Sequence, residues 1–203
     1  MRITGSVHIL PDSVRLNGRP VPVESLGADL PAELYRTRGV AYPKFFKMDL
    51  LCKLGFMATE LLVENEPDRF TPREDRAVLL FSRSGPLCND RNYQDTIAEG
   101  AYFPSPALFV YTLANIVTGE IAIRNKYEGD TTAFCLETFS PEALVAAVGD
   151  AFEDRCTTSA ICGWVECVDA HHYEALLFLV EQDASEGLPF TAETIRNIQQ
   201  SKI

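Results

Sequence analysis

The sequence predicts an α/β fold in which helices pack on a mixed, mostly parallel sheet of about five strands. Short apolar runs of strand length recur along the 203 residues, and segments with apolar residues at three- and four-residue intervals lie between them. Clusters of Gly, Pro, Asn and Asp separate the two kinds of segment. Because 46% of the residues are hydrophobic, 23% are charged and no repeat occurs, we expect residues 1–203 to form a single globular domain.

The first predicted elements are a strand and a long helix. Arg2–Leu10 alternates apolar and polar side chains, and Asp12 and Asn17-Gly18 supply typical turn residues after it. Pro43 then precedes a run of apolar residues at helical spacing. These residues are Phe46, Leu50, Leu51, Leu54, Met57, Leu61 and Leu62.

The middle of the chain predicts two further strands around a partly helical segment. Residues 64–75 are polar and typical of a loop, and Ala77–Phe81 is a short apolar run suited to a buried strand. Ser82–Pro86 closes that strand with a turn. Residues 106–123 are mostly apolar and helical in their second part, and residues 131–136 are the next strand candidate.

The last third begins with a clear helix start at Ser140-Pro141-Glu142. It combines a capping serine, a proline at the first helical position and an acid in the first turn. This helix extends to Phe152, and Thr158–Val165 and Glu174–Glu181 are apolar runs that supply two more strands. Strands that alternate with helices indicate a layered sheet with parallel members.

Composition narrows the class of protein. No apolar run reaches the roughly 18 residues needed to span a bilayer, and the first residues lack the pattern of a signal peptide. We therefore expect a cytoplasmic protein whose six cysteines are reduced thiols. Cys156, Cys162, Cys167, His171 and His172 lie close together, but their spacing matches no zinc knuckle, so we expect neither a metal nor a cofactor.

The net charge of −11 is unevenly distributed. Residues 1–126 contain 15 Lys and Arg against 15 Asp and Glu, whereas residues 127–203 contain 3 against 14. The whole acidic excess therefore lies in the C-terminal third, where we expect a solvated acidic surface. Because phosphates require a basic face, this distribution argues against nucleic acid as a partner.

Several short motifs occur in a fixed order between residues 102 and 131. They are Ser105-Pro106, Leu113-Ala114-Asn115, Gly119, Ile121-Ala122-Ile123-Arg124 and Gly129-Asp130-Thr131. This order resembles a signature of β-ketoacyl-carrier-protein synthases, in which Ser-Pro leads into Leu-Pro-Asn, Ile-x-Ile-Arg and Gly-Pro-Ser. Other pieces that resemble the family keep its order along the chain, namely Arg2–Gly5, Lys47–Asp49, Leu54–Ala58, Ser82–Gly85 and Cys162–Glu166.

The resemblance implies one half of the duplicated thiolase-like fold, the N-terminal half of a synthase. Such acyltransferases load an acyl chain from carrier protein onto a cysteine thiolate and condense it with an extender unit. In the family this cysteine lies nine residues after the first Gly of Gly-Pro-Ser. Counting forward from Gly129, and independently back from Gly163, leads to Thr138. The resemblance therefore implies that a threonine replaces the nucleophile.

This replacement changes what the site can do. A threonine hydroxyl needs an adjacent base to act as a nucleophile. Glu137 and Ser140 lie beside Thr138 at the expected helix start, where a thioester carbonyl could be held, and are the other candidate catalytic residues. Cys135 is expected to be a buried small hydrophobic residue of the preceding strand. The resemblance places the two catalytic histidines of the family beyond Ile203, so we expect no condensation by this chain alone.

Three functions remain open. The first, which we favour, is a non-catalytic partner of a full-length synthase, similar to a chain-length factor of fatty acid, polyketide or polyene assembly; homodimer formation is a further possibility. The second is a small enzyme that acts on acyl thioesters. The third is a module that binds acidic acyl carrier protein through a basic, aromatic patch. The basic candidates for that patch are Arg36, Arg38, Lys44, Lys47 and Lys53.

Overall fold

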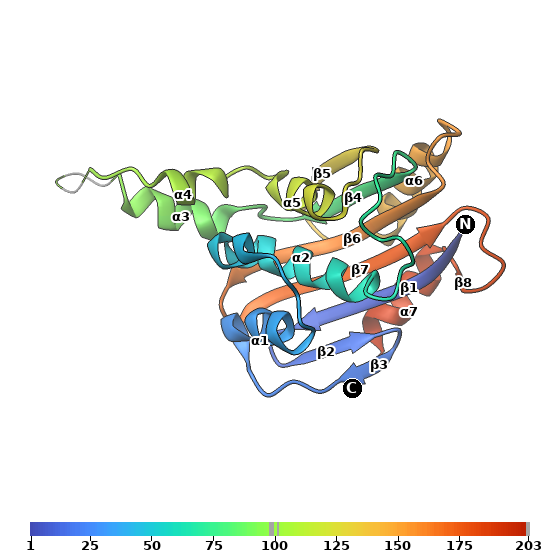
Figure 1. The fold of residues 1–203 in the computed structure, drawn as a ribbon, viewed down its shortest axis with the longest axis horizontal. Helices are drawn as coiled ribbons and strands as arrows, with labels where there is room; N and C mark the ends of the chain where they lie inside the picture. Colours follow the sequence, from blue (N-terminus) through green and yellow to red (C-terminus); the bar gives the residue numbers. More distant parts are fainter. Residues whose placement is uncertain (98–99, 101, 202–203) are drawn as a thin grey trace.

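The computed structural model describes residues 1–97, 100 and 102–201. Within these residues, one sheet of eight strands carries helices on both faces (Figure 1). The strands are β1 (Arg2–Leu10), β2 (Ser13–Leu16), β3 (Arg19–Val21), β4 (Arg76–Ser82), β5 (Thr131–Cys135), β6 (Ser159–Asp169), β7 (His172–Glu181) and β8 (Leu188–Pro189). The helices are α1 (Leu30–Thr37), α2 (Leu50–Leu62), α3 (Leu87–Asp95), α4 (Pro106–Val110), α5 (Ile116–Asn125), α6 (Pro141–Phe152) and α7 (Ala192–Gln200), with short 3-10 helices at Gly27–Asp29 and Pro43–Lys47.

The strand order is β3-β2-β1-β7-β6-β4-β5, with β8 paired to β1. The five predicted strands are confirmed as β1, β4, β5, β6 and β7, and so is the α/β arrangement. The sheet is larger than the expected five strands and is mostly antiparallel: among the described strands, only the β4–β5 and β4–β6 pairs are parallel.

Short connections explain the antiparallel pairs β1–β2, β2–β3 and β6–β7. Residues 170–171 alone join β6 to β7, and two residues cannot make the crossover of a dozen or more residues that parallel neighbours need. β1, β2 and β3 likewise follow one another through the predicted turns at Asp12 and Asn17-Gly18. Asn17 and Gly18 both have positive φ, 53° and 74°, which is the geometry of a tight hairpin turn.

The long predicted helix begins later than its apolar pattern indicates. Asp49 caps α2 by accepting a hydrogen bond from the backbone N–H of Cys52 at 3.0 Å, which fixes the helix start at Leu50. Phe46 instead lies in the preceding 3-10 helix and is 53% exposed. Beyond Asp49 the pattern holds, and α2 buries most of its circumference.

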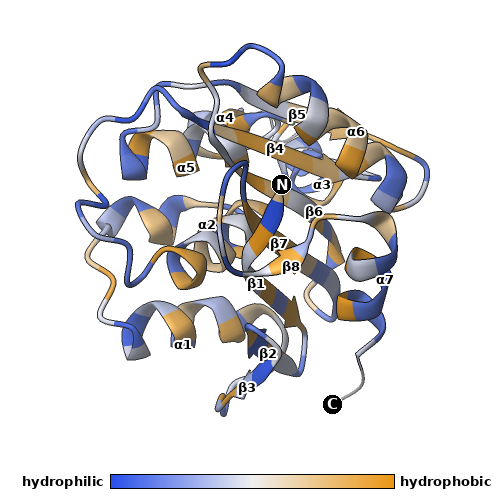
Figure 2. Ribbon diagram, turned by 90° about the vertical axis from the view of Figure 1, so that its right-hand side faces the viewer, coloured by the Kyte–Doolittle hydropathy of each residue, from blue (hydrophilic) through white to orange (hydrophobic). Residues whose placement is uncertain are grey.

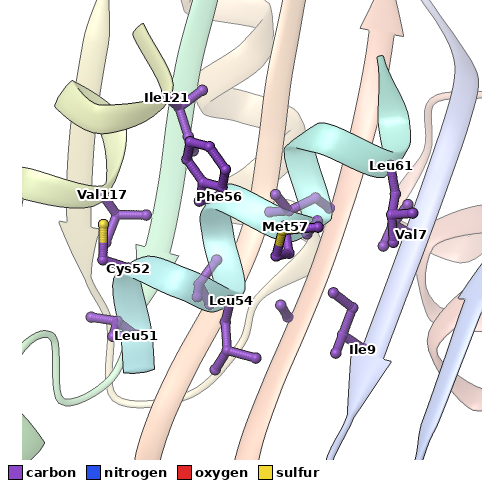
Figure 3. Packing of buried hydrophobic residues seen from close by; sticks show 14 of the residues in the cluster. Val7, Ile9, Leu51, Cys52, Leu54, Phe56, Met57, Leu61, Val117 and Ile121 are labelled. Atoms are coloured by element: carbon purple, nitrogen blue, oxygen red, sulfur yellow. The ribbon is translucent and has the colours of Figure 1, made fainter. Parts of the chain in front are cut away.

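Figure 2 shows the sheet between α1, α2 and α5 on one side and α6 and α7 on the other. Alternate residues of the central strands belong to two different cores. Val78 and Leu80 of β4 point toward α1, α2 and α5, whereas Leu79 and Phe81 point toward α6 and α7. Burial of each such side chain contributes about 1.5–3 kcal/mol, so both helical layers are held firmly on the sheet. Figure 3 shows part of the first core, where α2 packs on β1 and α5 through Leu51, Cys52, Leu54, Phe56, Met57, Leu61, Val7, Ile9, Val117 and Ile121.

At Gly163 of β6 the backbone of β7 leaves no room for a side chain. Its φ is +150°, and a Cβ at this position would overlap the backbone carbonyl of Leu176. Only glycine fits here without displacing one of the two central strands.

The helices α3 and α4 project beyond the end of the sheet (Figure 1). The side-chain amide of Asn89 donates to the Leu108 carbonyl at 2.8 Å, and the rings of Tyr93 and Phe109 lie 5.6 Å apart, so the two helices support each other. We call residues 87–113, as far as the structure describes them, the arm. The apolar segment at 106–123 was expected to be helical in its second part, which is α5, and its first part also forms the short helix α4 within the arm. No helix in the described part of the chain is both long and apolar enough to cross a bilayer.

Candidate functional site

The carboxyl ends of three parallel strands meet at one edge of the sheet. In the paired register, Ser82 at the end of β4 lies opposite Cys135 at the end of β5, and Phe81 lies opposite Trp164 of β6. The loops that follow β4 and β5 therefore lie side by side. Loops at the carboxyl ends of parallel strands are where open α/β sheets hold their ligands.

The start of α6 is formed as the sequence predicts. Ser140 has extended backbone geometry, and its hydroxyl accepts a hydrogen bond from the Ala143 N–H at 3.2 Å. Pro141 occupies the first turn, and Glu142 adds a negative charge where the helix dipole favours one. The Ser140 side chain thus serves as the helix cap, and its predicted catalytic role remains untested.

Thr138 lies in the bend between β5 and α6, two residues before the cap, and is exposed, as is Glu137. Among the described residues, no hydrogen bond joins the Thr138 hydroxyl to a carboxylate or an imidazole. A hydroxyl without such a base is a weak nucleophile at neutral pH. The structure thus brings all three predicted catalytic residues to one helix start, but gives Thr138 no activating partner.

Cys135 is exposed, which corrects the expectation of a buried thiol. The reason is its place: it is the last residue of β5, and β5 is the outermost strand of the sheet. Its sulfur would lie 3.9 Å from a Cβ placed on Gly85, as would the Ala114 Cβ. These residues line a small apolar cavity of about 20 Å³, a volume for one water molecule and too small for an acyl chain.

Sequence reasoning missed the role of Glu166. Its carboxylate lies on β6 and accepts hydrogen bonds from the Ser82 hydroxyl at 2.8 Å, the Arg83 N–H at 2.7 Å, the Ser84 N–H at 3.1 Å and the Ser84 hydroxyl. Burial alone would raise the pKa of Glu166, but these donors outweigh it and hold the pKa below its ordinary value. The ionised carboxylate therefore fixes the loop after β4 beside the start of α6.

The motif at 162–166 contains Glu166, but the motif does not indicate which groups the carboxylate hydrogen-bonds. They lie more than 80 residues away in the chain, and two of the four donors are backbone N–H groups. A carboxylate at the end of an apolar strand is recognisable as unusual, whereas its hydrogen-bond partners depend on the β4–β6 pairing.

The predicted basic patch is only partly available for docking. Arg38 pairs with Glu64 at 3.1 Å, and Lys44 pairs with the fully buried carboxylate of Glu120 at 2.5 Å. The hydrogen bond to Glu120 raises the pKa of Lys44. In addition, Lys53 lies 5.8 Å from the centre of the Phe45 ring. Arg36 and Lys47 are exposed, and no salt bridge involves either of them in the described part of the chain.

Glu120, the partner of Lys44, is a carboxylate buried in the core. Besides Lys44, Glu120 accepts hydrogen bonds from the hydroxyls of Tyr42 at 3.2 Å and Tyr111 at 3.4 Å. Nearby, burial raises the pKa of Asp49 to about 6, although its cap bond to the Cys52 N–H works in the opposite direction. Lys44 thus neutralises a buried carboxylate, so its charge serves the interior of this protein.

Comparison of the sequence with protein-family models and with curated proteins gives no match. Solved structures do match. The ishigamide ketosynthase/chain length factor aligns with a TM-score of 0.62 and 18% identity, over 93% of this chain and 63% of the matched chain. A chain from the complex of a ketosynthase with its chain length factor from Xenorhabdus doucetiae aligns with a TM-score of 0.59 and 13% identity, over 98% and 90% of the two chains.

A β-ketoacyl synthase from Burkholderia phymatum STM815 aligns with a TM-score of 0.55 and 12% identity, over 89% of this chain and 59% of the matched one. The chain thus spans less than two thirds of the ishigamide and Burkholderia proteins and nine tenths of the Xenorhabdus chain. These likenesses show the fold: the protein has the half of a thiolase-like fold that the motifs implied.

Proposed function

We propose that this chain is a non-catalytic subunit that pairs with a ketosynthase in a condensing system for polyketides, polyenes or fatty acids. The observation that carries the proposal is Thr138, an exposed residue just before α6 whose hydroxyl forms no hydrogen bond to a carboxylate or imidazole of the described residues. We further propose that residues 1–203 act as one domain of this subunit, in the cytoplasm.

The chemistry of condensation supports this role. A ketosynthase needs a thiolate to hold the acyl chain as a thioester, and a helix N-terminus stabilises that thiolate. A threonine ester would be a poor acyl donor, and no described carboxylate or imidazole is hydrogen-bonded to the hydroxyl to deprotonate it. At the same time the surrounding frame is intact, because Ser140 caps α6 and Glu166 fixes the adjacent loop. Loss of a nucleophile from an intact frame fits a partner better than a catalyst.

The comparisons support the same role. The Xenorhabdus match is a chain from a complex of a ketosynthase with its chain length factor, and it is only slightly longer than this chain, because the alignment covers 98% of one and 90% of the other. A chain of this size therefore occurs within such a complex. We extend that assembly, a ketosynthase with a second subunit of related fold, to this protein.

Co-expression tests the proposal. Each ketosynthase encoded in the genome that carries this chain is co-expressed with a tagged copy of it, and the purified material is separated by size-exclusion chromatography. We expect one ketosynthase to co-elute in a 1:1 ratio and to condense acyl and malonyl units on carrier protein. The chain alone is expected to leave both substrates unchanged by mass spectrometry. A chain that binds no ketosynthase would contradict the proposal.

One observation favours a second candidate function, the processing of acyl thioesters. The exposed thiol of Cys135 lies at the same edge as Thr138 and could accept an acyl group from carrier protein. Incubation with acyl-carrier protein, followed by mass spectrometry of the intact chain, distinguishes the two functions. A covalent acyl adduct that is lost in Cys135→Ser but kept in Thr138→Ala would support the enzyme. An absence of adduct and turnover would leave the subunit role.

A carrier-binding role rests on Arg36 and Lys47, which are the exposed members of the basic patch without an ion pair in the described structure. Charge reversal of both residues should weaken binding of acyl carrier protein if they dock it. Reversal of Lys44 is an unsuitable test, because it would place a second carboxylate beside the buried Glu120.

A further inference from the structure

A hollow lies between the β1–β2 hairpin and the last helix of the chain, α7. Its volume is about 510 Å³, and residues of β1, β2, β8 and α7 contribute to its walls. A second hollow of about 330 Å³ adjoins it, because His8, Arg15 and Ser201 line both. Pockets that bind small molecules measure about 300–1,000 Å³, so this region has room for a ligand.

The hollow exists because one face of the β1–β2 hairpin has no helix packed over it. On the opposite face, Val7 and Ile9 of β1 and Val14 of β2 belong to the core beneath α1 and α2. β2 and β3 contribute no residue to the core described beneath α6 and α7. Figure 2 shows α1 beside β2 and β3, whereas α7 ends above them. The side chains of the hairpin that point toward α7 therefore line the hollow.

The charge of these walls favours an anion. His8 of β1 and Arg15 of β2 are direct cross-strand partners, so their side chains lie on the same face of the sheet. Among the described residues, no Asp or Glu lines either hollow, although the chain has 29 acidic residues and a net charge of −11. A cavity lined by one sign of charge concentrates ligands of the opposite sign.

Arg15 has donors available for such an anion. It is half-buried, it forms no salt bridge within the described residues, and its one hydrogen bond there is donated from Nη1 to the Ser201 carbonyl. A guanidinium has five N–H donors in a planar fork that matches a carboxylate. His8 is already engaged, because its Nε2 lies 2.8 Å from Oε1 of Glu174, and Glu174 lines neither hollow. Arg15 is thus the anchor for an anionic group.

The other end of the hollow is apolar. Ile3 of β1 and Leu188 of β8 are paired across the two strands, and Ile198 of α7 adds a third apolar side chain to the lining. Five residues separate Ile3 from His8 along β1, which corresponds to about 16 Å. A ligand that extends from Arg15 to Ile3 is therefore elongated, and its body gains from burial against apolar side chains.

The charges beyond the apolar end fix the direction of the ligand. Glu181 and Glu186 line a neighbouring hollow that shares Thr4 and Gly187 with this one. These carboxylates repel an anionic group, whereas Arg15 attracts it. We infer that the hollow binds a linear aliphatic carboxylate, with the carboxylate on Arg15 and the chain directed toward the apolar end.

This site lies apart from the candidate site at Thr138. The strands β7, β6 and β4 separate β1 from β5, which corresponds to about 19 Å at the usual strand spacing. Binding in the hollow is therefore a further function of the chain, and it does not depend on the proposed pairing with a ketosynthase.

A series of ligands tests the site on the wild-type chain. Decanoate, hexanoate, decan-1-ol and decylammonium are titrated at pH 7, below the concentrations at which they form micelles, and amide shifts are followed by two-dimensional NMR. Decanoate should shift amides of β1, β2 and α7 in a saturable manner. Hexanoate has the head but a shorter chain, and decan-1-ol has the chain but no charge, so each should bind about tenfold or more weakly. Decylammonium, with the opposite charge, should bind more weakly than decan-1-ol.

A pair of arginine variants tests the anchor. Arg15→Gln removes the guanidinium, and Arg19→Gln is the matched control because Arg19 is exposed on β3 and lines neither hollow. We expect Arg15→Gln to weaken decanoate binding about tenfold or more and to leave the affinity for decan-1-ol unchanged. Arg19→Gln should bind both ligands as the wild type does. Circular dichroism checks that both variants fold.

Three results would overturn the inference. The first is that decanoate does not bind, or that decylammonium binds as well as decanoate does. The second is that Arg15→Gln binds decanoate as tightly as Arg19→Gln. The third is that the shifted amides lie around Thr138 and not in β1, β2 and α7. None of these results bears on the ketosynthase pairing, which the co-expression experiment tests separately.

Discussion

Replacement of Glu166 is the sharpest test of how the loop beside the candidate site is held. The carboxylate accepts four hydrogen bonds from Ser82, Arg83 and Ser84, and the residue is 8% exposed. Glu166→Ala removes the charge and leaves these neutral donors without their acceptor, and an unsatisfied buried donor costs about 1–3 kcal/mol. We expect Glu166→Ala to lower the free energy of unfolding by about 3 kcal/mol.

Glu166→Gln should have a smaller effect. Its amide oxygen can still accept two of the four hydrogen bonds, while its NH₂ group faces donors, so a loss of about 1–2 kcal/mol is expected. Urea unfolding at pH 7, followed by the fluorescence of Trp164, measures both values. Glu137→Gln is the control: its side chain is exposed, and its replacement should change stability by less than about 0.5 kcal/mol.

The dependence on pH supplies a second readout. The pKa of Glu166 in the folded protein lies below its ordinary value of 4.5. The ionised carboxylate therefore contributes its full stabilisation above pH 4.5, and this contribution is lost as the pH falls through the folded-state pKa. The difference between wild type and Glu166→Gln should shrink below pH 4.5. If Glu166→Ala matches wild type at pH 7, the carboxylate does not hold the loop.

Three further predictions follow from the core and the thiols. Burial raises the folded-state pKa of Asp49 to about 6, above its ordinary 3.8, so its ionisation opposes folding above pH 6 and stability should rise as the pH falls toward 4. Asp49→Asn should be as stable as wild type or more so at pH 7, and its stability should no longer change over this pH range. If the variant keeps the pH dependence, another group causes it. Gly163→Ala should lower the free energy of unfolding by about 3 kcal/mol or prevent folding, because its Cβ overlaps the Leu176 carbonyl. The control Gly149→Ala has open space around its Cβ and should be neutral or stabilising. Equal urea midpoints for the two variants would contradict the close approach of Leu176 to Gly163. Under native conditions iodoacetamide should label the exposed Cys135 and Cys156 first, as read by peptide mass spectrometry, and early labelling of the buried thiols would show that the sheet is open.

Much of the fold could be predicted because its signals are local. The alternation in Arg2–Leu10 and the apolar runs at 77–81 and 174–181 marked strands, since their residues face either one or two cores. The serine, proline and glutamate at 140–142 marked the start of α6, since each satisfies a requirement of a helix end.

Other elements could not be predicted, because their stability comes from distant partners. β3 and β8 have three and two residues, too few to show a period, and they exist through pairing with β2 and β1. α3 has one buried residue, Asn89, and therefore no apolar stripe for a pattern to reveal. The parallel or antiparallel direction of strand pairing also depends on the lengths of the connections between strands. Those lengths follow only from the exact ends of the strands, which the sequence pattern does not give.

The candidate site likewise has features that could be predicted from the sequence and features that could not. Thr138 was located by counting between two glycines, and Gly163 is a sound anchor because the close approach to Leu176 requires glycine. The exposure of Cys135 was missed because a strand gives no local sign that it lies at the edge of a sheet. The grouping of Glu166 with the loop after β4 needed the pairing of β4 with β6, two strands that are far apart in the sequence.

The exposed aromatic residues of the arm have a consequence for the life of the protein in a cell. A copy with nothing bound to the arm presents apolar aromatic side chains that chaperones bind and that promote aggregation. Such orphan copies are expected to be removed by proteolysis faster than assembled ones. Under the proposed subunit role, the amount of this protein at steady state should then follow the supply of the ketosynthase, so that the two subunits remain balanced without a dedicated regulator.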